Sequence, residues 1–219
     1  MKLFSWLKGT FYFLYYWFWA DLIYLASKLF FRLKYRYKEK IPKKGKLVVV
    51  ANHQSFLDPP LIGIGTGRRN YYMGRKTLFK GLAGWHLHAL NTYPIDKDNP
   101  IGGVKKTLRL LQEENCVVMF PEGTRTPDGK MHSFLGGVLA IAKRSKAPIL
   151  PAAISGAYEA FPRDKKLPRP HKVIVTYGRI IPAEEIQAMS NDELLRFLEY
   201  QVRELLGEEI PAPLPEEQH

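Results

Sequence analysis

The chain has 219 residues, of which 46% are hydrophobic and 25% charged, a balance that excludes a largely disordered protein. The length suits one substantial core, and no shift in composition marks a second globular domain. The net charge of +12 and the pI near 9.7 indicate an anionic partner, which could be nucleic acid, an acidic carrier protein or an anionic lipid surface.

An aromatic, apolar segment opens the chain. Residues 9 to 20 read GTFYFLYYWFWA without a charge, and apolar side chains continue beyond Asp21 to Phe31. The segment lacks the short aliphatic region and the cleavage site of a secretory signal. Because Tyr and Trp prefer the membrane interface and the uncharged run is shorter than a span of about 20 residues, we expect a helix lying in one leaflet. A tilted span, or a helix covering the protein's own core or a partner, remains an alternative.

A basic stretch follows this segment. Between residues 28 and 46 the single acid is Glu39, and every other charged side chain is Lys or Arg. Such a stretch could be a solvated, flexible connector, yet a basic cluster beside an apolar membrane segment is also attracted to anionic headgroups. By the positive-inside rule it predicts the inner face of the cytoplasmic membrane. We therefore expect residues 1–40 to form a membrane-associating helical segment with a basic connector.

Residues 41–207 carry the pattern of an α/β domain, in which short β-branched runs alternate with helix-like segments. The expected strands cover residues 47–51, 70–73, 116–120, 149–154 and 172–177. The expected helices cover about residues 100–114, 136–146 and 190–207, the last opening with a capping box of Ser190 and Glu193. Because the first, third and fourth strands are nearly all apolar, we expect a mixed, largely parallel central sheet flanked by helices. The acidic, proline-rich tail over residues 208–219 is expected to be disordered.

Neither the single cysteine nor the paired histidines predict a catalytic or metal centre. Cys116 lies in a predicted buried strand, where its thiol stays protonated, and alone it cannot form an internal disulfide. A reducing compartment is the simpler interpretation. His86 and His88 diverge on the surface of a helix-like stretch, so we expect a structural role for them and no metal.

A polar turn follows the first predicted strand and reads Asn52-His53-Gln54-Ser55-Phe56-Leu57-Asp58. Sites in α/β sheets are built at the carboxyl ends of strands, so His53 stands where a base is useful. One helical turn would return the Asp58 carboxylate to Nδ1 of His53 and leave Nε2 to accept a proton from a substrate hydroxyl. The alternative is a surface turn in which Asp58 caps a helix that begins at Pro59.

The second motif, Phe120-Pro121-Glu122-Gly123-Thr124-Arg125, also follows an apolar strand. Gly123 permits a close backbone approach, the backbone amides and Thr124 can donate hydrogen bonds, and Arg125 offers a planar fork. This combination favours a phosphate or carboxylate ligand. The alternative is an ordinary polar turn in which Arg125 forms a salt bridge with Glu122.

Together with two further blocks, these motifs resemble the 1-acyl-glycerol-3-phosphate acyltransferases of the glycerolipid acyltransferase superfamily. The H-x-x-x-x-D block of His53 and Asp58 comes first in that family, followed by a block like residues 93–97, the F-P-E-G-T-R block, and a proline-containing block like residues 150–154. The second block of the family usually ends in Arg, whereas Lys97 lacks the bidentate fork. Arg75 matches a cation that the family often has before a Leu-Phe pair.

This resemblance implies acyl transfer to the 2-hydroxyl of 1-acyl-sn-glycerol-3-phosphate, which yields phosphatidic acid. The donor would be a thioester of acyl carrier protein or coenzyme A, with no metal and no other cofactor. His53 would be the general base, oriented by Asp58. The implied substrate-binding residues are Arg75, Lys97, Glu122, Gly123, Thr124 and Arg125.

Three other functions stay open at the level of sequence. The His–Asp pair could serve hydrolysis in a lipase or thioesterase, with water as the acceptor. The chain could also be a non-enzymatic binder of membranes or nucleic acid, although its aromatic residues are not interleaved with cations as a nucleic-acid groove requires. Finally, the acceptor could be another lysophospholipid or glycerol 3-phosphate.

Overall fold

A computed structural model describes residues 2–96 and 101–208 of the chain. At its centre lies a seven-stranded sheet in the order β1-β7-β6-β2-β5-β3-β4. In chain order the strands are β1 (Lys34–Tyr37), β2 (Leu47–Ala51), β3 (Asn70–Arg75), β4 (Thr92–Ile95), β5 (Cys116–Met119), β6 (Ile149–Ser155) and β7 (Ile174–Tyr177). β6 and β7 are antiparallel and the other neighbouring strands are parallel, which confirms the expected mixed, largely parallel sheet.

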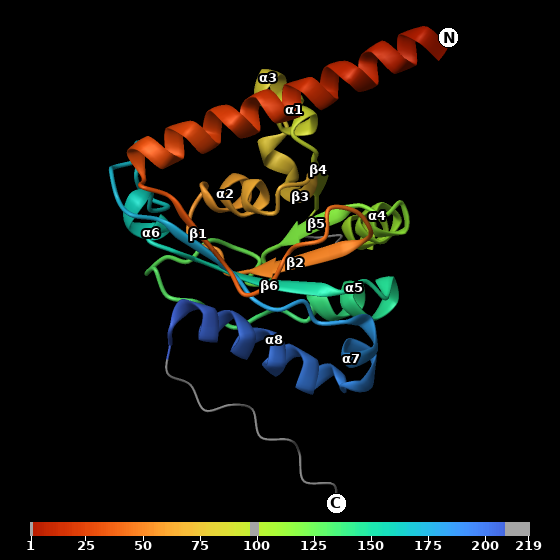
Figure 1. Cartoon of the computed structure of the whole chain (residues 1–219), viewed down its shortest axis with the longest axis vertical. Helices are drawn as coiled ribbons and strands as arrows, with labels where there is room; N and C mark the ends of the chain where they lie inside the picture. Colours follow the sequence, from red (N-terminus) through yellow and green to blue (C-terminus); the bar gives the residue numbers. More distant parts are fainter. Residues whose placement is uncertain (1, 97–100, 209–219) are drawn as a thin grey trace, which may run out of the picture.

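Helices lie on both sides of the sheet (Figure 1). One side carries α4 (Ile101–Gln112), α5 (Gly137–Ser145), α7 (Ala183–Ala188) and α8 (Asn191–Leu206), and α8 opens with the expected capping box. The other side carries α1 (Lys2–Phe30), α2 (Asp58–Gly65) and α6 (Ala157–Ala160). The short 3-10 helix η1 (Lys76–Leu78) precedes α3 (Gly81–Ala89), which contacts both β4 and α1.

The central strands are buried on both faces, as their apolar sequences predict. Successive side chains of a strand point to opposite faces. In β2, Val48 and Val50 therefore join the core beneath α4, α5 and α8, whereas Leu47, Val49 and Ala51 join the core beneath α2. All five are 0% exposed. This buried centre holds the carboxyl ends of β2 and β5 side by side, and the two predicted motifs begin there.

The two strands that the sequence pattern does not predict lie at the edges of the sheet. β1 pairs in parallel with β7, so the sheet begins inside the predicted basic connector and before residue 41. Tyr37 stacks on Tyr177 of β7, with ring centroids 5.2 Å apart. β4 contains Pro94, which an edge strand tolerates because one side of the strand needs no ladder partner.

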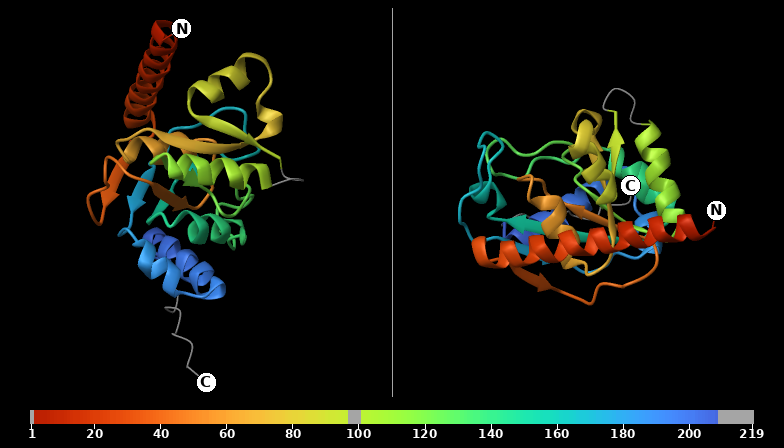
Figure 2. Two further views of the ribbon diagram at one scale, coloured as in Figure 1. Left: turned by 90° about the vertical axis from the view of Figure 1, so that its right-hand side faces the viewer. Right: turned by 90° about the horizontal axis from the view of Figure 1, so that it is seen from above.

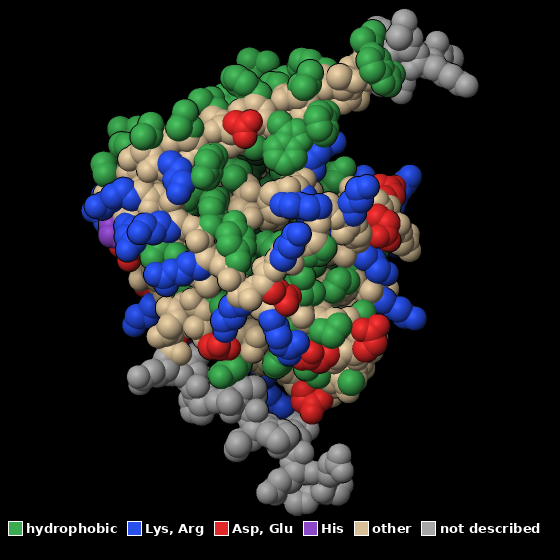
Figure 3. Space-filling model, viewed as in Figure 1, with side chains coloured by type: hydrophobic (Ala, Val, Ile, Leu, Met, Phe, Trp, Pro, Cys, Tyr) green, Lys and Arg blue, Asp and Glu red, His purple; other side chains and the backbone are tan. Residues whose placement is uncertain are grey.

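The aromatic N-terminal segment is one continuous helix, α1, which lies across α2 and contacts α3 (Figure 2). Tyr16 and Ala20 are buried on its inner side. Its outer side exposes a row of large apolar side chains (Figure 3). Trp6, Phe18 and Leu29 are among the exposed apolar residues of the helix. Within residues 2–96 and 101–208, no helix combines the length and the hydropathy that a bilayer span requires. Apart from Glu208, the predicted acidic tail lies outside the described residues.

Candidate active site

The backbone leaves the sheet at Asn52, directly after β2. The Asn52 side chain is buried and bonds both backbone groups of Ile154, donating to its oxygen at 2.9 Å and accepting from its nitrogen at 2.8 Å. The side chain thus takes over the ladder that β2 shares with β6. Because the Asn52 side chain bonds both backbone groups of Ile154, no buried backbone group of that residue lacks a hydrogen bond where the main chain turns away at His53.

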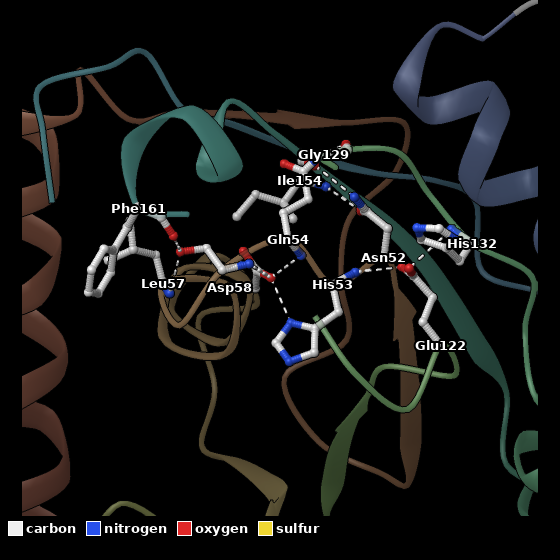
Figure 4. A network of polar contacts seen from close by, with 11 residues as sticks. Asn52, His53, Gln54, Leu57, Asp58, Glu122, Gly129, His132, Ile154 and Phe161 are labelled. Carbon is white, nitrogen blue, oxygen red and sulfur yellow. Dashed lines mark hydrogen bonds and ion pairs between the residues drawn. The ribbon is translucent and has the colours of Figure 1, made fainter. Parts of the chain in front are cut away.

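His53 and Asp58 form the pair that the sequence predicts (Figure 4). Nδ1 of His53 lies 2.7 Å from Oδ2 of Asp58. A carboxylate only accepts, so Nδ1 donates this hydrogen bond and Nε2 is left for a substrate proton. The imidazole also stacks on Phe120, with the ring centroids 4.2 Å apart. The His53 side chain is 18% exposed, which keeps it accessible from the cavity described below.

Asp58 is the fixed partner of the pair. Its side chain is fully buried and Oδ2 also accepts the backbone N–H groups of Gln54, at 2.5 Å, and Ser55, at 2.6 Å. Burial raises the pKa of Asp58, and the hydrogen bonds from His53, Ser55 and Gln54 oppose that rise. The carboxylate turns back into the 52–58 turn and makes no capping bond to α2, whose N-cap is Leu57. The alternative of a simple helix cap is therefore wrong.

The loop after β5 forms hydrogen bonds with both backbone groups of His53. Oε1 of Glu122 accepts the His53 N–H at 2.7 Å, and the N–H of Thr126 donates to the His53 oxygen at 2.8 Å. Oε2 of Glu122 accepts the N–H of His132 at 3.1 Å. Burial raises the pKa of Glu122, while these backbone donors oppose the rise. Glu122 thus holds the backbone of His53 in place, whereas the sequence predicts a role for Glu122 in substrate binding.

Gly123, Thr124 and Arg125 face the cavity. Gly123 has φ of +68°, a conformation that side chains with a Cβ rarely adopt. The hydroxyl of Thr124 accepts a hydrogen bond from Nη2 of Arg75 at 3.1 Å. Arg75 comes from the end of β3, so the structure brings together two cation-bearing segments that lie far apart in the sequence.

Arg125 does not pair with Glu122. Its guanidinium lies over the ring of Phe56, 3.5 Å from the centroid, and its buried Nη1 has no hydrogen-bond partner within the described part of the chain. Burial lowers the pKa of Arg125, and the like charges of Arg163 and Arg75 lower it further. A buried donor without a partner, held beside other cations, is suited to an anionic ligand.

These groups open into one cavity of about 490 Å³. His53, Arg75, Thr124, Arg125 and Arg163 line one part of it, called its polar end below, where Arg75 bonds Thr124 and the charges of Arg75, Arg163 and the His53 partner Asp58 act on Arg125. The remainder is largely apolar and is walled by α1, α2, β3 and α3, with Tyr16, Ala20, Ile23, Pro60, Ile64, Tyr72, Leu87 and Leu90 among the lining residues. The hydroxyl of Tyr15 lies 2.7 Å from Nδ1 of His86, which joins α1 to α3 at this wall.

The set of cations that line the cavity differs from the set that the sequence predicts at two positions, 97 and 163. Lys97 lies outside the described residues, so its predicted place in the site stays a prediction. Arg163, which the sequence reasoning missed, lines the cavity from the loop after α6. The signal that could have found it is its placement, because Arg163 follows β6 as Arg125 follows β5, shortly past the end of a buried central strand.

Comparisons with known proteins agree with this arrangement. A family model described as Acyltransferase matches residues 32–155, more than half of the chain. The 1-acyl-sn-glycerol-3-phosphate acyltransferase of Bacillus subtilis is 33% identical over 122 residues, which are 54% of this chain and 60% of that protein. The protein of the same name from Pseudomonas aeruginosa is 29% identical over 184 residues, 82% of this chain and 71% of that protein.

Among solved structures, the 1-acyl-sn-glycerophosphate acyltransferase of Thermotoga maritima has the same fold. The TM-score is 0.67 at 24% identity, and the match covers 90% of this chain and 95% of that one. The chain spans less than two thirds of the Bacillus subtilis relative, and 38% of a chloroplastic relative from Arabidopsis thaliana.

Proposed function

Since the chain belongs to the acyltransferase family, we propose that it transfers an acyl group from a thioester to the 2-hydroxyl of 1-acyl-sn-glycerol-3-phosphate. The product would be phosphatidic acid, a precursor of phospholipids. The observation that carries the proposal is the His53–Asp58 pair at the end of a large apolar cavity, beside cations suited to a phosphate. The names of the Bacillus subtilis and Pseudomonas aeruginosa relatives support the choice of acceptor.

In this reaction His53 acts as a general base, and no covalent enzyme intermediate is needed. Nε2 accepts the proton of the 2-hydroxyl while its oxygen attacks the thioester carbonyl. The tetrahedral intermediate then collapses, the C–S bond breaks, and the departing thiolate takes the proton from the imidazolium. Asp58 keeps Nδ1 protonated throughout and stabilises the transient positive charge of the ring.

The phosphate of the acceptor would bind at the polar end of the cavity. Arg125 offers an unused buried donor there, and Arg75 is oriented by its bond to Thr124. Guanidinium groups bind phosphate through parallel N–H···O bonds, which fix the position of the ligand as well as its charge. The phosphate of the acceptor is attached to the carbon next to the one that bears the reactive hydroxyl. Phosphate binding here would therefore place that hydroxyl near Nε2 of His53.

The apolar part of the cavity would take an acyl chain. Its walls include Tyr16, Ala20 and Ile23 of α1 together with Ile64 of α2. Burial of each methylene group contributes about 0.8 kcal/mol, so a long chain in this space binds strongly without polar contacts. Because α1 forms one wall, the helix would also determine where the chain enters.

The same helix supports a place at the inner face of the cytoplasmic membrane. Trp6, Phe18 and Leu29 are 64%, 62% and 75% exposed, the cation Lys28 lies in the last turn of the helix, and Arg32 follows its C-terminal end. We therefore place α1 in one leaflet, with its apolar side chains in the lipid and the cations at anionic headgroups. Flotation with phosphatidylglycerol vesicles should recover the protein, and Phe18→Asp should reduce the recovered fraction.

An assay of purified protein in detergent tests the proposed reaction. Donors would be acyl carrier protein and coenzyme A thioesters, and acceptors would be 1-acylglycerol 3-phosphate, other lysophospholipids and glycerol 3-phosphate. We expect phosphatidic acid as the main product with either donor. Free fatty acid released at the same rate without an acceptor would instead identify a hydrolase. Preference for another acceptor would show that the enzyme acylates a different lysophospholipid or glycerol 3-phosphate.

A further inference from the structure

We propose that Arg163 is a third phosphate-binding arginine, which holds the phosphomonoester of the acceptor together with Arg75 and Arg125. The proposal deepens the proposed function and rests on it. Arg163 lies outside every motif that predicts the site, and it lines the same cavity as His53, Arg75 and Arg125. Its loop connects α6 to β7, so three separate segments of the chain converge on this end of the cavity.

The loop that carries Arg163 contacts the turn of residues 52–58, called the catalytic turn below. The buried hydroxyl of Ser55 donates to the oxygen of Phe161 at 2.8 Å, and the rings of Phe56 and Phe161 lie 6.2 Å apart. The N–H of Ser55 also bonds Asp58, so one residue holds both the carboxylate and the start of the arginine loop. Ser55 has no step in the proposed mechanism, and this contact gives it one structural task beside the site.

The charges around Arg163 leave the cation available to a ligand. Its neighbour Asp164 forms an ion pair with Lys165 at 3.1 Å. Burial lowers the pKa of Arg125 most, the positive charges of Arg163 and Arg75 lower it further, and the Asp58 carboxylate opposes the shift. Like charges that converge in this way repel one another, and an anion bound among them removes the repulsion.

The chemistry of the acceptor identifies the anion. A phosphomonoester carries close to two negative charges at neutral pH and presents three acceptor oxygens. It is attached next to the carbon that bears the reactive hydroxyl, so it must bind close to His53. The donor also carries phosphate, but the long pantetheine arm separates it from the thioester carbonyl, so it would not lie beside the reacting atoms as the phosphomonoester of the acceptor must.

The test compares three variants at one loop. Arg163→Gln removes the charge from the cavity lining, and Arg163→Lys keeps the charge but loses the planar guanidinium. Lys166→Gln removes an equal charge from a residue that is exposed, as Arg163 is, but lies outside the cavity lining. We expect Arg163→Gln to raise the KM for 1-acylglycerol 3-phosphate about 10-fold or more, with a smaller rise for Arg163→Lys. The KM for the thioester should stay within about 2-fold of the wild type in all three.

Equilibrium binding separates this proposal from the reaction itself. With His53→Ala as the background, binding of 1-acylglycerol 3-phosphate and of 1-acylglycerol, which lacks the phosphate, is measured in detergent. Arg163→Gln should weaken only the phosphorylated ligand, and Lys166→Gln should leave both unchanged. Equal weakening of the two ligands, an effect on the thioester alone, or equal effects of the two glutamine variants would overturn the role of Arg163. Absence of acyl transfer by the wild type would instead overturn the proposed function.

Discussion

The catalytic turn, residues 52–58, and the arginine group, Arg75, Arg125 and Arg163, lie side by side in one cavity but are built in opposite ways. In the turn, Oδ2 of Asp58 accepts three hydrogen bonds, and the backbone of His53 is bonded on both sides. In the arginine group, like charges converge and Nη1 of Arg125 has no partner within the described residues. Within the described residues Oδ1 of Asp58 and Oε1 of Gln54 also have no partner, so the difference lies in the charges. The bonds to Oδ2 and to the His53 backbone hold the base before a ligand arrives, whereas converging like charges are neutralised by an anionic ligand.

This contrast assigns the two regions different parts of the reaction. A fixed base lowers the barrier of the chemical step, so damage to the turn should appear in kcat. A set of cations completed by the substrate contributes binding, so damage to the arginine group should appear in the acceptor KM. Substitutions in each region therefore test this assignment.

The largest effect is expected for His53→Ala. Removal of a general base typically slows a reaction by about 10²–10⁴-fold, and nothing else in the turn offers an equivalent nitrogen. The rate of phosphatidic acid formation measures this loss, with thermal unfolding and vesicle flotation as controls for folding and membrane association. Turnover near the wild-type rate would show that the base lies elsewhere.

Asp58→Asn should come next. The amide oxygen can take the place of Oδ2 and keep the three hydrogen bonds, but the negative charge that stabilises the imidazolium during proton transfer is lost. We expect kcat to fall about 10²-fold or more with little change in the acceptor KM. A change confined to KM would contradict the assignment of Asp58 to the turn.

Arg125→Ala should act through binding. Loss of a charge-assisted hydrogen bond costs about 1.5–3 kcal/mol, which corresponds to a rise of about 10- to 150-fold in the acceptor KM. Steady-state kinetics with each substrate varied in turn measures the effect, and the KM for the thioester should change less. A larger change for the thioester would move the phosphate site away from Arg125.

Glu122→Gln sharpens the division because the sequence places this residue with the substrate and the structure places it behind His53. The amide keeps one acceptor for two backbone donors, so one of the bonds to His53 and His132 is lost. We expect kcat to fall about 5-fold while the acceptor KM is unchanged, since a net hydrogen bond contributes about 1 kcal/mol. The reverse pattern would return Glu122 to substrate binding.

Cys116 belongs to neither region and should affect neither parameter. Burial raises the pKa of its thiol to about 12, so the folded protein should resist thiol reagents at pH 8 and keep full activity. The unfolded thiol titrates near pH 8.5, so its contribution to stability is complete below that value and is lost as the pH rises toward 12. Labelling in the native state with loss of activity would contradict this account.

The sequence predicts the buried centre of the fold better than its edges. Central strands such as β2 are covered on both faces and appear as continuous apolar runs. β1 alternates tyrosines with cations and β4 contains a proline, so neither forms such a run. The predicted boundary between connector and domain fell inside the sheet for this reason.

The site follows the same division between local and distant contacts. His53 and Asp58 lie within one turn, so their hydrogen bond could be predicted from spacing. The bond of Glu122 to the His53 backbone, and the approach of Arg163 to Arg125, depend on loops that follow different central strands and meet at the carboxyl ends of those strands. No local pattern specifies those contacts.

The most direct test of the division uses an acceptor that can bind but cannot react, such as 1-acyl-glycerol-3-phosphate without its 2-hydroxyl. Its inhibition constant would be measured for the wild type, His53→Ala and Arg125→Ala. Where turnover is too slow for inhibition kinetics, the dissociation constant of the radiolabelled compound would be measured instead. We predict an unchanged constant for His53→Ala and an increase of about 10-fold or more for Arg125→Ala. An increase for His53→Ala with none for Arg125→Ala would contradict the account.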